Sequence, residues 1–145
     1  MKKFLMTVMA AFLLSGAAMA EGYVPPEVPG VWQEISKADM DTLYFDSSRC
    51  TYDPATDTAV VWMRTDTENL KETYVTTYTI DFAAGRARMG EKGWLYKNKK
   101  VREMKNLASS MAITPGTYGE KLAAAVAAFV DRDGKLAAYR AAEGR

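Results

Sequence analysis

Polar and apolar residues alternate over much of the middle of this chain, and the alternation predicts β-strands. The clearest run is TYVTTYTIDF, residues 73–82. Successive side chains of a strand point to opposite faces, so the even-numbered residues of this run would share one face and the odd-numbered residues the other. Residues 59–65 alternate in the same way, with Val61 and Met63 on the face opposite to Trp62. Both segments are expected to bury one face in a core.

Shorter segments rich in strand-forming residues predict the rest of a sheet. They lie at residues 31–35, 42–46, 86–89, 94–96 and, less clearly, 100–104. Turn-forming residues at 53–57 and 83–85 separate consecutive strands and favour antiparallel hairpins. Residues 46–48, Asp-Ser-Ser, are expected to end the second strand through side-chain bonds to the backbone.

The pattern changes to a helical one at TPGTYGEKLAAAVAAFV, residues 114–130. Thr117 and Glu120 have capping-box spacing, in which the threonine accepts from the backbone N–H of Glu120 and the glutamate reaches back to Thr117. The predicted buried stripe of the helix consists of Tyr118, Leu122, Val126 and Phe129. Residues 131–134 would end or kink this helix, and residues 135–143 could add a further turn or two.

These elements predict an α+β fold, with a small antiparallel β-sheet of about five to six strands and a C-terminal α-helix packed on it. The DRDG segment at Asp131–Gly134 resembles part of a calcium loop. A calcium loop needs further oxygen ligands and a closing glutamate in register, which this segment lacks, so we interpret it as a helix end at glycine.

The N-terminus has the three parts of a secretory signal peptide. Lys2 and Lys3 precede an uncharged apolar run, residues 4–14, and the small-x-small pattern before Glu21 places cleavage between Ala20 and Glu21. The apolar run is too short to cross a hydrocarbon core of ~30 Å. We therefore expect an exported protein located in the periplasm, at the cell surface or outside the cell.

The rest of the chain divides into two parts. Residues 21–30 are proline-rich and predict an extended leader without packing of its own, and residues 31–145 form a single domain. Residues 14–16, Leu-Ser-Gly, also occur in bacterial lipoprotein signals, but Ala17 follows here in place of the lipid-bearing cysteine. We therefore expect neither a lipid anchor nor stable membrane insertion.

Composition excludes several functional classes. The chain has no histidine, which removes Ser-His-Asp triads and histidine metal sites. Cleavage after Ala20 would lower the count of Lys and Arg from 19 to 17 against 18 acids, so the net charge would change from +1 to −1. That charge argues against nucleic acid as a partner. We expect no catalytic residues, no metal and no cofactor.

Cys50 is the only cysteine of the chain and rules out an internal disulfide. In an oxidising compartment it would be buried as a small apolar residue, or exposed and able to cross-link two chains in a homodimer. We expect burial, because Cys50 lies beside predicted strand residues.

One stretch of the mature chain, YKNKKVREMK at residues 96–105, is strongly basic and is our candidate for a macromolecule-binding site. Its positive side chains could meet an acidic protein surface or a sulfated glycan. The alternative is an edge strand whose lysines prevent sheet-to-sheet aggregation. The candidate residues are Lys97, Lys99, Lys100, Arg102 and Lys105.

Two further groups of residues have both structural and functional interpretations. Aspartates 39, 41, 46, 53 and 57 could include the paired carboxylates of a hydrolase, but each also has a turn or strand-end explanation. Trp32, Trp62 and Trp94 could line a binding groove, although tryptophans of a small sheet protein usually belong to the core. We prefer the structural interpretation for both groups.

Several segments of the chain together form a recognisable pattern. They include Trp32, residues 44–46 (YFD), residues 60–62 (VVW) and residues 78–81 (YTID), and the most specific is ITPGTYGEKL at residues 113–122. The pattern resembles the surface-adhesin protein E family of bacterial exported proteins, and the likeness runs from Trp32 to about Val130. The resemblance implies an exported antiparallel sheet with a C-terminal helix, and in named members adhesion to host matrix or serum proteins such as vitronectin, laminin or plasminogen.

The sequence departs from that family in two ways. Members often have one cysteine after the strand-ending aspartate and another near the helix end, whereas Phe82 and Phe129–Val130 occupy these places here. The lipid-anchor cysteine is missing as well. We therefore expect a non-enzymatic exported binding domain of adhesin type. A soluble periplasmic protein of the same fold, with a housekeeping or assembly role and no host ligand, is the alternative, and a carboxylate hydrolase is the third.

Overall fold

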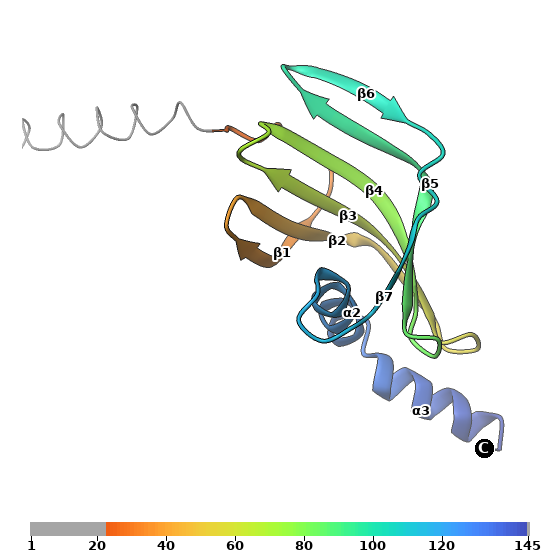
Figure 1. The fold of residues 1–145 in the computed structure, drawn as a ribbon. Helices are drawn as coiled ribbons and strands as arrows, with labels where there is room; N and C mark the ends of the chain where they lie inside the picture. The colour runs from red at the N-terminus through yellow and green to blue at the C-terminus, as the bar shows by residue number, and fades with distance from the viewer. Residues whose placement is uncertain (1–22, 145) are drawn as a thin grey trace, which may run out of the picture.

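The computed structural model describes residues 23–144 (Figure 1). It contains an open antiparallel sheet followed by two helices, which confirms the predicted α+β class. The strands are β1 (Trp32–Ala38), β2 (Asp41–Asp53), β3 (Thr58–Thr67), β4 (Glu72–Asp81), β5 (Arg86–Lys97), β6 (Lys100–Met104) and β7 (Ser110–Ala112). The helices are α2 (Tyr118–Phe129) and α3 (Arg132–Ala142).

The strands from β1 to β6 are neighbours in chain order, and every pair is antiparallel. Short turns connect them, as the sequence predicts for consecutive hairpins. β7 pairs with the first part of β5, on the same side of β5 as β6. The turns β1–β2, β3–β4 and β5–β6 therefore meet at one end of the sheet.

Two of the long strands contain irregularities that the sequence pattern did not reveal. The Asp-Ser-Ser segment at residues 46–48 makes the expected local bonds, but β2 continues past it to Asp53 with a shift of register. The two segments predicted at 86–89 and 94–96 are one strand, β5, with a register shift between them. Gly90 lies in that shift, and a Cβ there would come within 2.1 Å of Thr77 Oγ1.

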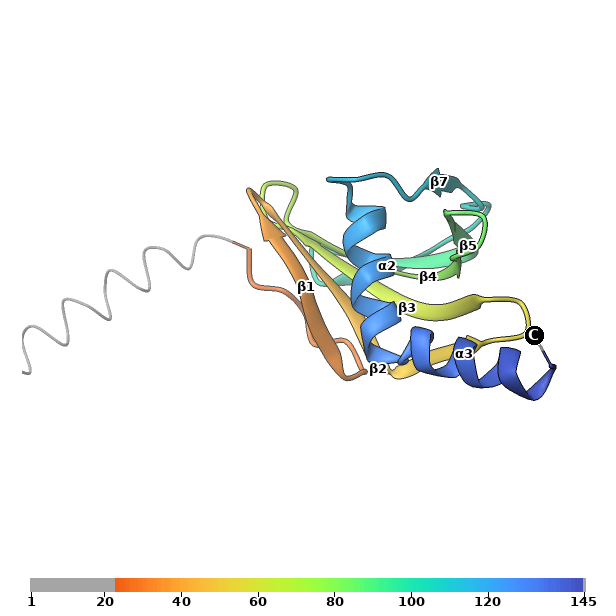
Figure 2. The same ribbon diagram turned by 90° about the horizontal axis from the view of Figure 1, so that it is seen from below.

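The core lies between one face of the sheet and α2 (Figure 2). The alternation of β3 and β4 has the predicted phase, because Val61 and Ile80 are fully buried in the core while Val60 and Thr79 are exposed on the opposite face. From the helix, Leu122 and Val126 are fully buried against the sheet. The central sheet residues and α2 therefore make up a single hydrophobic core.

The buried stripe of α2 is shifted from the predicted one. Leu122 and Val126 are buried as expected, but Tyr118 is 41% exposed and Phe129 is 50% exposed. Phe129 still makes an edge-to-face contact with Phe45, whose ring centroid is 5.5 Å away. The stripe is completed by Gly119, Ala123 and Val130. Small residues let α2 lie close to the sheet, which leaves its aromatic ends at the rim.

The N-terminus of α2 has half of the predicted capping box. Thr117 Oγ1 accepts from the backbone N–H of Glu120 at 3.3 Å. The carboxylate of Glu120 accepts from the N–H of Gly116 and does not reach the N–H of Thr117, which instead donates to Thr114 O. The Glu120 carboxylate therefore binds the N–H one residue before the one that capping-box spacing predicts.

The DRDG segment joins two helices, and its glycine does not end the first of them. Asp131 has the left-handed conformation (φ 53°) that ends α2, whereas Gly134 lies inside α3. Arg132 of the same segment binds Asp57 in the β2–β3 turn through two hydrogen bonds of 2.8 and 2.6 Å. This bidentate pair attaches α3 to the sheet, and it lowers the pKa of the Asp57 carboxyl.

The proline-rich segment is extended, as predicted, but it packs on the sheet face opposite to α2. Arg64 and Arg49 donate to the carbonyl oxygens of Pro26 and Pro29, at 3.0 and 2.9 Å. Trp32 Nε1 donates to Val28 O at 2.9 Å. The expectation that this leader has no packing is therefore wrong for its described part, residues 23–30, whose backbone oxygens find donors on the sheet.

Cys50 is half-buried and packs against the edge of the core. Burial raises the pKa of its thiol. No helix of the described residues is long and apolar enough to cross a membrane. The predicted signal peptide and its cleavage point at Ala20–Glu21 lie outside the described residues.

Candidate binding surface

Four of the five basic candidate residues belong to the β5–β6 hairpin, which has a two-residue loop. Lys97 of β5 lies opposite Lys100 of β6, and only Asn98 and Lys99 separate them. Both of these residues have positive φ, at 54° and 59°. A two-residue loop with positive φ at both positions is a type I′ turn, whose twist matches that of the strands it joins. The local sequence thus presents its lysines at the tip of a rigid two-stranded ribbon.

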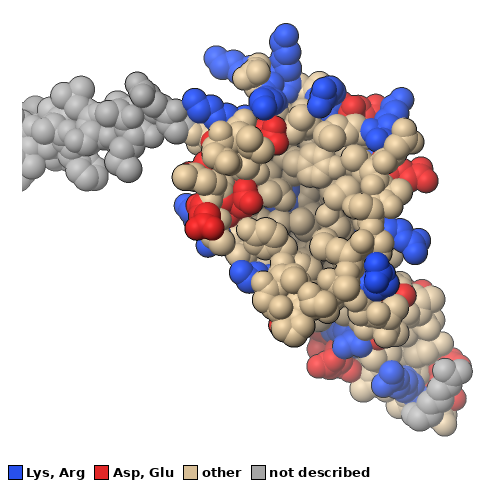
Figure 3. Space-filling view, in the orientation of Figure 1, with Lys and Arg blue, Asp and Glu red and all other residues tan. Residues whose placement is uncertain are grey.

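The structure brings four of the five candidate residues together. Lys97, Lys99, Lys100 and Arg102 surround the hairpin tip, whereas Lys105 lies beyond the far end of β6. In Figure 3, Lys and Arg side chains gather at the top of the view, where Figure 1 shows this hairpin. We call Lys97, Lys99, Lys100 and Arg102 the basic tip. The prediction that Lys105 belongs to the same site is not supported by this placement.

Most of the positive charge of the basic tip is uncompensated. Lys97 Nζ lies 3.4 Å from a carboxylate oxygen of Glu72, its cross-strand partner on β4. Within residues 23–144, the other three members of the basic tip have no carboxylate within ion-pair distance. All four are exposed. A surface with free cations attracts anions in solution, although screening by salt weakens the attraction.

A groove of about 520 Å³ runs between the basic tip and the proline-rich segment. Its apolar lining includes Val24 and Val101, which are 73% and 57% exposed. Lys71, from the β3–β4 turn, adds a further positive charge to the rim. The sequence did not assign Lys71 or residues 23–27 to the site, because their approach depends on the strand order.

A second hollow, of about 440 Å³, lies on the other side of the same ribbon. Leu95 forms its floor, and Lys97, Lys100 and Arg102 line it together with Glu72. Cross-strand partners share a face, so Lys100 lies on the face of Lys97, and Arg102 on that of Leu95. The ribbon therefore has a cationic face toward the helix side, whereas Val101 and Glu103 of β6 lie on the face toward the leader.

The three tryptophans lie on the sheet face that carries the leader, and all are half-buried. Trp62 and Trp94 stack with ring centroids 5.4 Å apart. Arg49 lies over Trp62, with its guanidinium carbon 4.5 Å from the ring centroid. These rings and Val28 border a shallow hollow of about 190 Å³. The tryptophans therefore neither belong fully to the core nor line an open groove, because the leader covers part of their surface.

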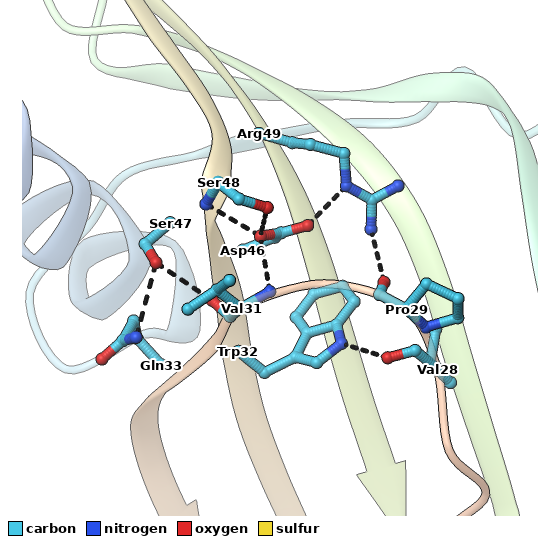
Figure 4. A network of polar contacts seen from close by, with 9 residues as sticks. All are labelled: Val28, Pro29, Val31, Trp32, Gln33, Asp46, Ser47, Ser48 and Arg49. Atoms are coloured by element: carbon cyan, nitrogen blue, oxygen red, sulfur yellow. Dashed lines mark hydrogen bonds and ion pairs between the residues drawn. The ribbon is translucent and has the colours of Figure 1, made fainter.

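Asp46 anchors the start of β1 to the β2 bulge (Figure 4). Its fully buried carboxylate accepts from the backbone N–H groups of Val31 (3.0 Å) and Ser48 (2.9 Å), from the Ser48 hydroxyl (2.6 Å) and from Arg49. Burial by itself raises the pKa of Asp46, but the hydrogen bonds to Ser48, Val31 and Arg49 outweigh it and lower the pKa to about 2. This aspartate has a structural role.

A second buried network lies beneath the leader. Arg64 and Thr73 both donate to Asp66 Oδ1, at 2.9 and 2.6 Å. The three residues are at most 8% exposed. The Thr73 hydroxyl also bonds the Tyr23 hydroxyl at 2.5 Å, and Arg64 reaches the Pro26 carbonyl. The leader is therefore held by hydrogen bonds to Arg64 and Thr73, two members of this buried network.

The carboxylates suggested for a hydrolase are used in other ways. Asp46 and Asp57 are bound to arginines, and Asp53 accepts from the N–H of Ala55 within its turn. Asp39 has positive φ in the β1–β2 turn, and Asp41 begins β2. Over residues 23–144, His, Cys, Asp and Glu side chains form no group of three that could hold a metal ion.

Comparison of the chain with protein-family models, with curated proteins and with solved structures gave no match. The resemblance to the surface-adhesin protein E family thus stays a prediction from the residues quoted above. The geometry of the basic tip is the feature of the structure that points to a function.

Proposed function

We propose that this protein is an exported, non-enzymatic domain that binds an acidic macromolecule through the basic tip. The observation that carries the proposal is the arrangement of the tip, where three uncompensated cations and Lys97 surround apolar grooves on both faces of one ribbon. Exposed charges steer a partner and fix its orientation, while apolar floors supply contact area. An acidic protein surface matches both features. The family resemblance supports host matrix or serum proteins as partners.

The first test removes the charge of the basic tip. The variant with Lys97, Lys99, Lys100 and Arg102 all changed to Ser is expected to bind poly-L-glutamate about thirtyfold more weakly, because each exposed ion pair contributes about 0.5 kcal/mol and four are lost. Titration with fluorescent polyglutamate measures the affinity. Vitronectin and laminin capture is measured in parallel.

A control with the same charge change is available on other surfaces. Lys37, Arg88, Lys135 and Arg140 are exposed and make no ion pair with the described residues. Changing these four to Ser should reduce binding by less than about threefold, since only the long-range field is lost. Equal loss in the two variants would remove the basic tip as a site. The melting temperatures of both variants show whether the fold is intact.

The alternative is a periplasmic protein of the same fold with no host ligand. The observation that favours it is that β6 forms the edge of the sheet, where exposed lysines also discourage pairing between molecules. Protease treatment of intact cells carrying a C-terminally tagged protein separates the two. Digestion is expected for a surface adhesin, whereas full protection with the tag in the soluble periplasm would exclude adhesion to host proteins.

A further inference from the structure

We propose that the basic tip takes its partner as an added β-strand. The occupant is an extended protein segment in which acidic residues alternate with apolar ones, paired along the free edge of β6. This inference rests on the proposed function and specifies the form in which the acidic partner binds.

The backbone of β6 offers hydrogen bonds along its free edge. In a two-residue hairpin the residues that flank the loop, Lys97 and Lys100, form a hydrogen-bonded pair, and the pattern then alternates. Arg102 is therefore bonded to Leu95, whereas the N–H and C=O groups of Val101 and Glu103 point away from β5. Among the described residues, no strand pairs with this edge. An extended segment could satisfy these groups by strand addition.

The side chains of β6 determine which segment fits. Lys100 and Arg102 lie on one face of the sheet, and Val101 and Glu103 lie on the other, where Lys92 lies 3.8 Å from the Glu103 carboxylate. An added strand would place every second side chain beside these two cations and the intervening ones beside Val101 and the groove lined by Val24. Acidic residues on the first face match the two cations in charge, and an apolar residue on the second face matches Val101 and the groove beside it.

Pairing of two copies through β6 is disfavoured by the same charges. An antiparallel pair centred on the middle of the strand would place Arg102 beside Arg102 or beside Lys100 of the second copy. Like charges directly opposite one another destabilise a sheet. The edge therefore discriminates against its own copy and favours an acidic strand.

Val101 allows strand addition to be tested without a change of charge. Its N–H faces the free edge, so Val101→Pro removes one donor to an added strand and none to β5. Val101→Thr is the control, because it keeps the N–H and a strand-forming side chain. The probe is an acetylated eight-residue peptide in which Glu alternates with Val. A peptide with the same composition but its four Glu and four Val in separate blocks is the second control.

The expected result is that Val101→Pro binds the alternating peptide about tenfold more weakly than Val101→Thr, because a peptide acceptor loses its donor. Val101→Thr should bind within about threefold of the unchanged protein, and the blocked peptide more weakly than the alternating one. In addition, N-methylation of the peptide amides that would face β6 should abolish binding to the unchanged protein. This second readout applies even if the proline variant does not fold.

Three outcomes would overturn the inference: equal affinity of the two Val101 variants, unchanged binding of the N-methylated peptide, or no binding of the alternating peptide. If binding of polyglutamate or heparin still depended on the basic tip in these cases, the proposed function would survive, and the tip would recognise charge alone. Heparin binding without polyglutamate binding would identify a sulfated glycan as the partner. Loss of all dependence on the basic tip would remove both proposals.

Discussion

Replacing Leu122 with Ala is expected to lower the free energy of unfolding by about 2–5 kcal/mol. The side chain is fully buried between α2 and the sheet, and its loss leaves a cavity in the single core of the domain. The helix has no disulfide to the sheet, because the chain has only one cysteine. Its position therefore depends on packing and on the Arg132–Asp57 pair at its end. Urea unfolding followed by circular dichroism measures the change.

Two further substitutions on α2 make this result specific. Ala124 is exposed, so Ala124→Ser should change stability by less than about 0.5 kcal/mol. Phe129→Ala should cost less than Leu122→Ala, because half of the Phe129 side chain is already exposed. A loss below about 1 kcal/mol for Leu122→Ala would mean that α2 is not docked as described, since such a loss is typical of a surface site.

The second large effect is expected at Asp46. Replacement by Ala should cost about 3–5 kcal/mol, because it leaves the buried N–H groups of Val31 and Ser48 without an acceptor and removes the partner of Arg49. Asp39→Asn is the control, since Asp39 is exposed and asparagine tolerates its positive φ. Unfolding of both variants at neutral pH measures the difference.

The lowered pKa of Asp46 also predicts how the stability of the protein depends on pH. Its pKa is about 2 in the folded protein and 3.8 in the unfolded chain, so the folded state favours the ionised form. The corresponding stabilisation, about 2 kcal/mol, is complete above pH ~4 and is lost as the pH falls toward 2. The Asp46→Ala variant should lack this part of the acid dependence. An unchanged acid slope in the variant would show that Asp46 is not the titrating group.

The period-two pattern of the sequence was sufficient to predict the fold class and the inward faces of the central strands. Val61 and Ile80 are buried because strand side chains alternate, and one face of this sheet is covered. The helical stripe was predicted less well. Phe129 has the right spacing, but it is the last residue of α2, where its ring contacts Phe45 at one edge and half of the residue stays exposed.

The site was predicted only in part, for a physical reason. Adjacent lysines in a two-residue hairpin must lie close together, so Lys97, Lys99 and Lys100 could be found from sequence. Strand order brings Lys71 to the basic tip, and the buried Arg64–Asp66 pair holds the leader beside it. Neither arrangement can be recognised from a short stretch of the sequence. Lys105 is near in sequence, but the extended strand carries it away from the tip.

The most direct measurement of the central proposal is the affinity for poly-L-glutamate across a salt series, for the unchanged protein and the two four-residue variants. Recognition by exposed cations predicts that affinity falls steeply with salt for the unchanged protein and for the control variant. The variant of the basic tip should bind weakly at every salt concentration, with a shallow dependence. Superimposable curves for the two variants would contradict the proposal.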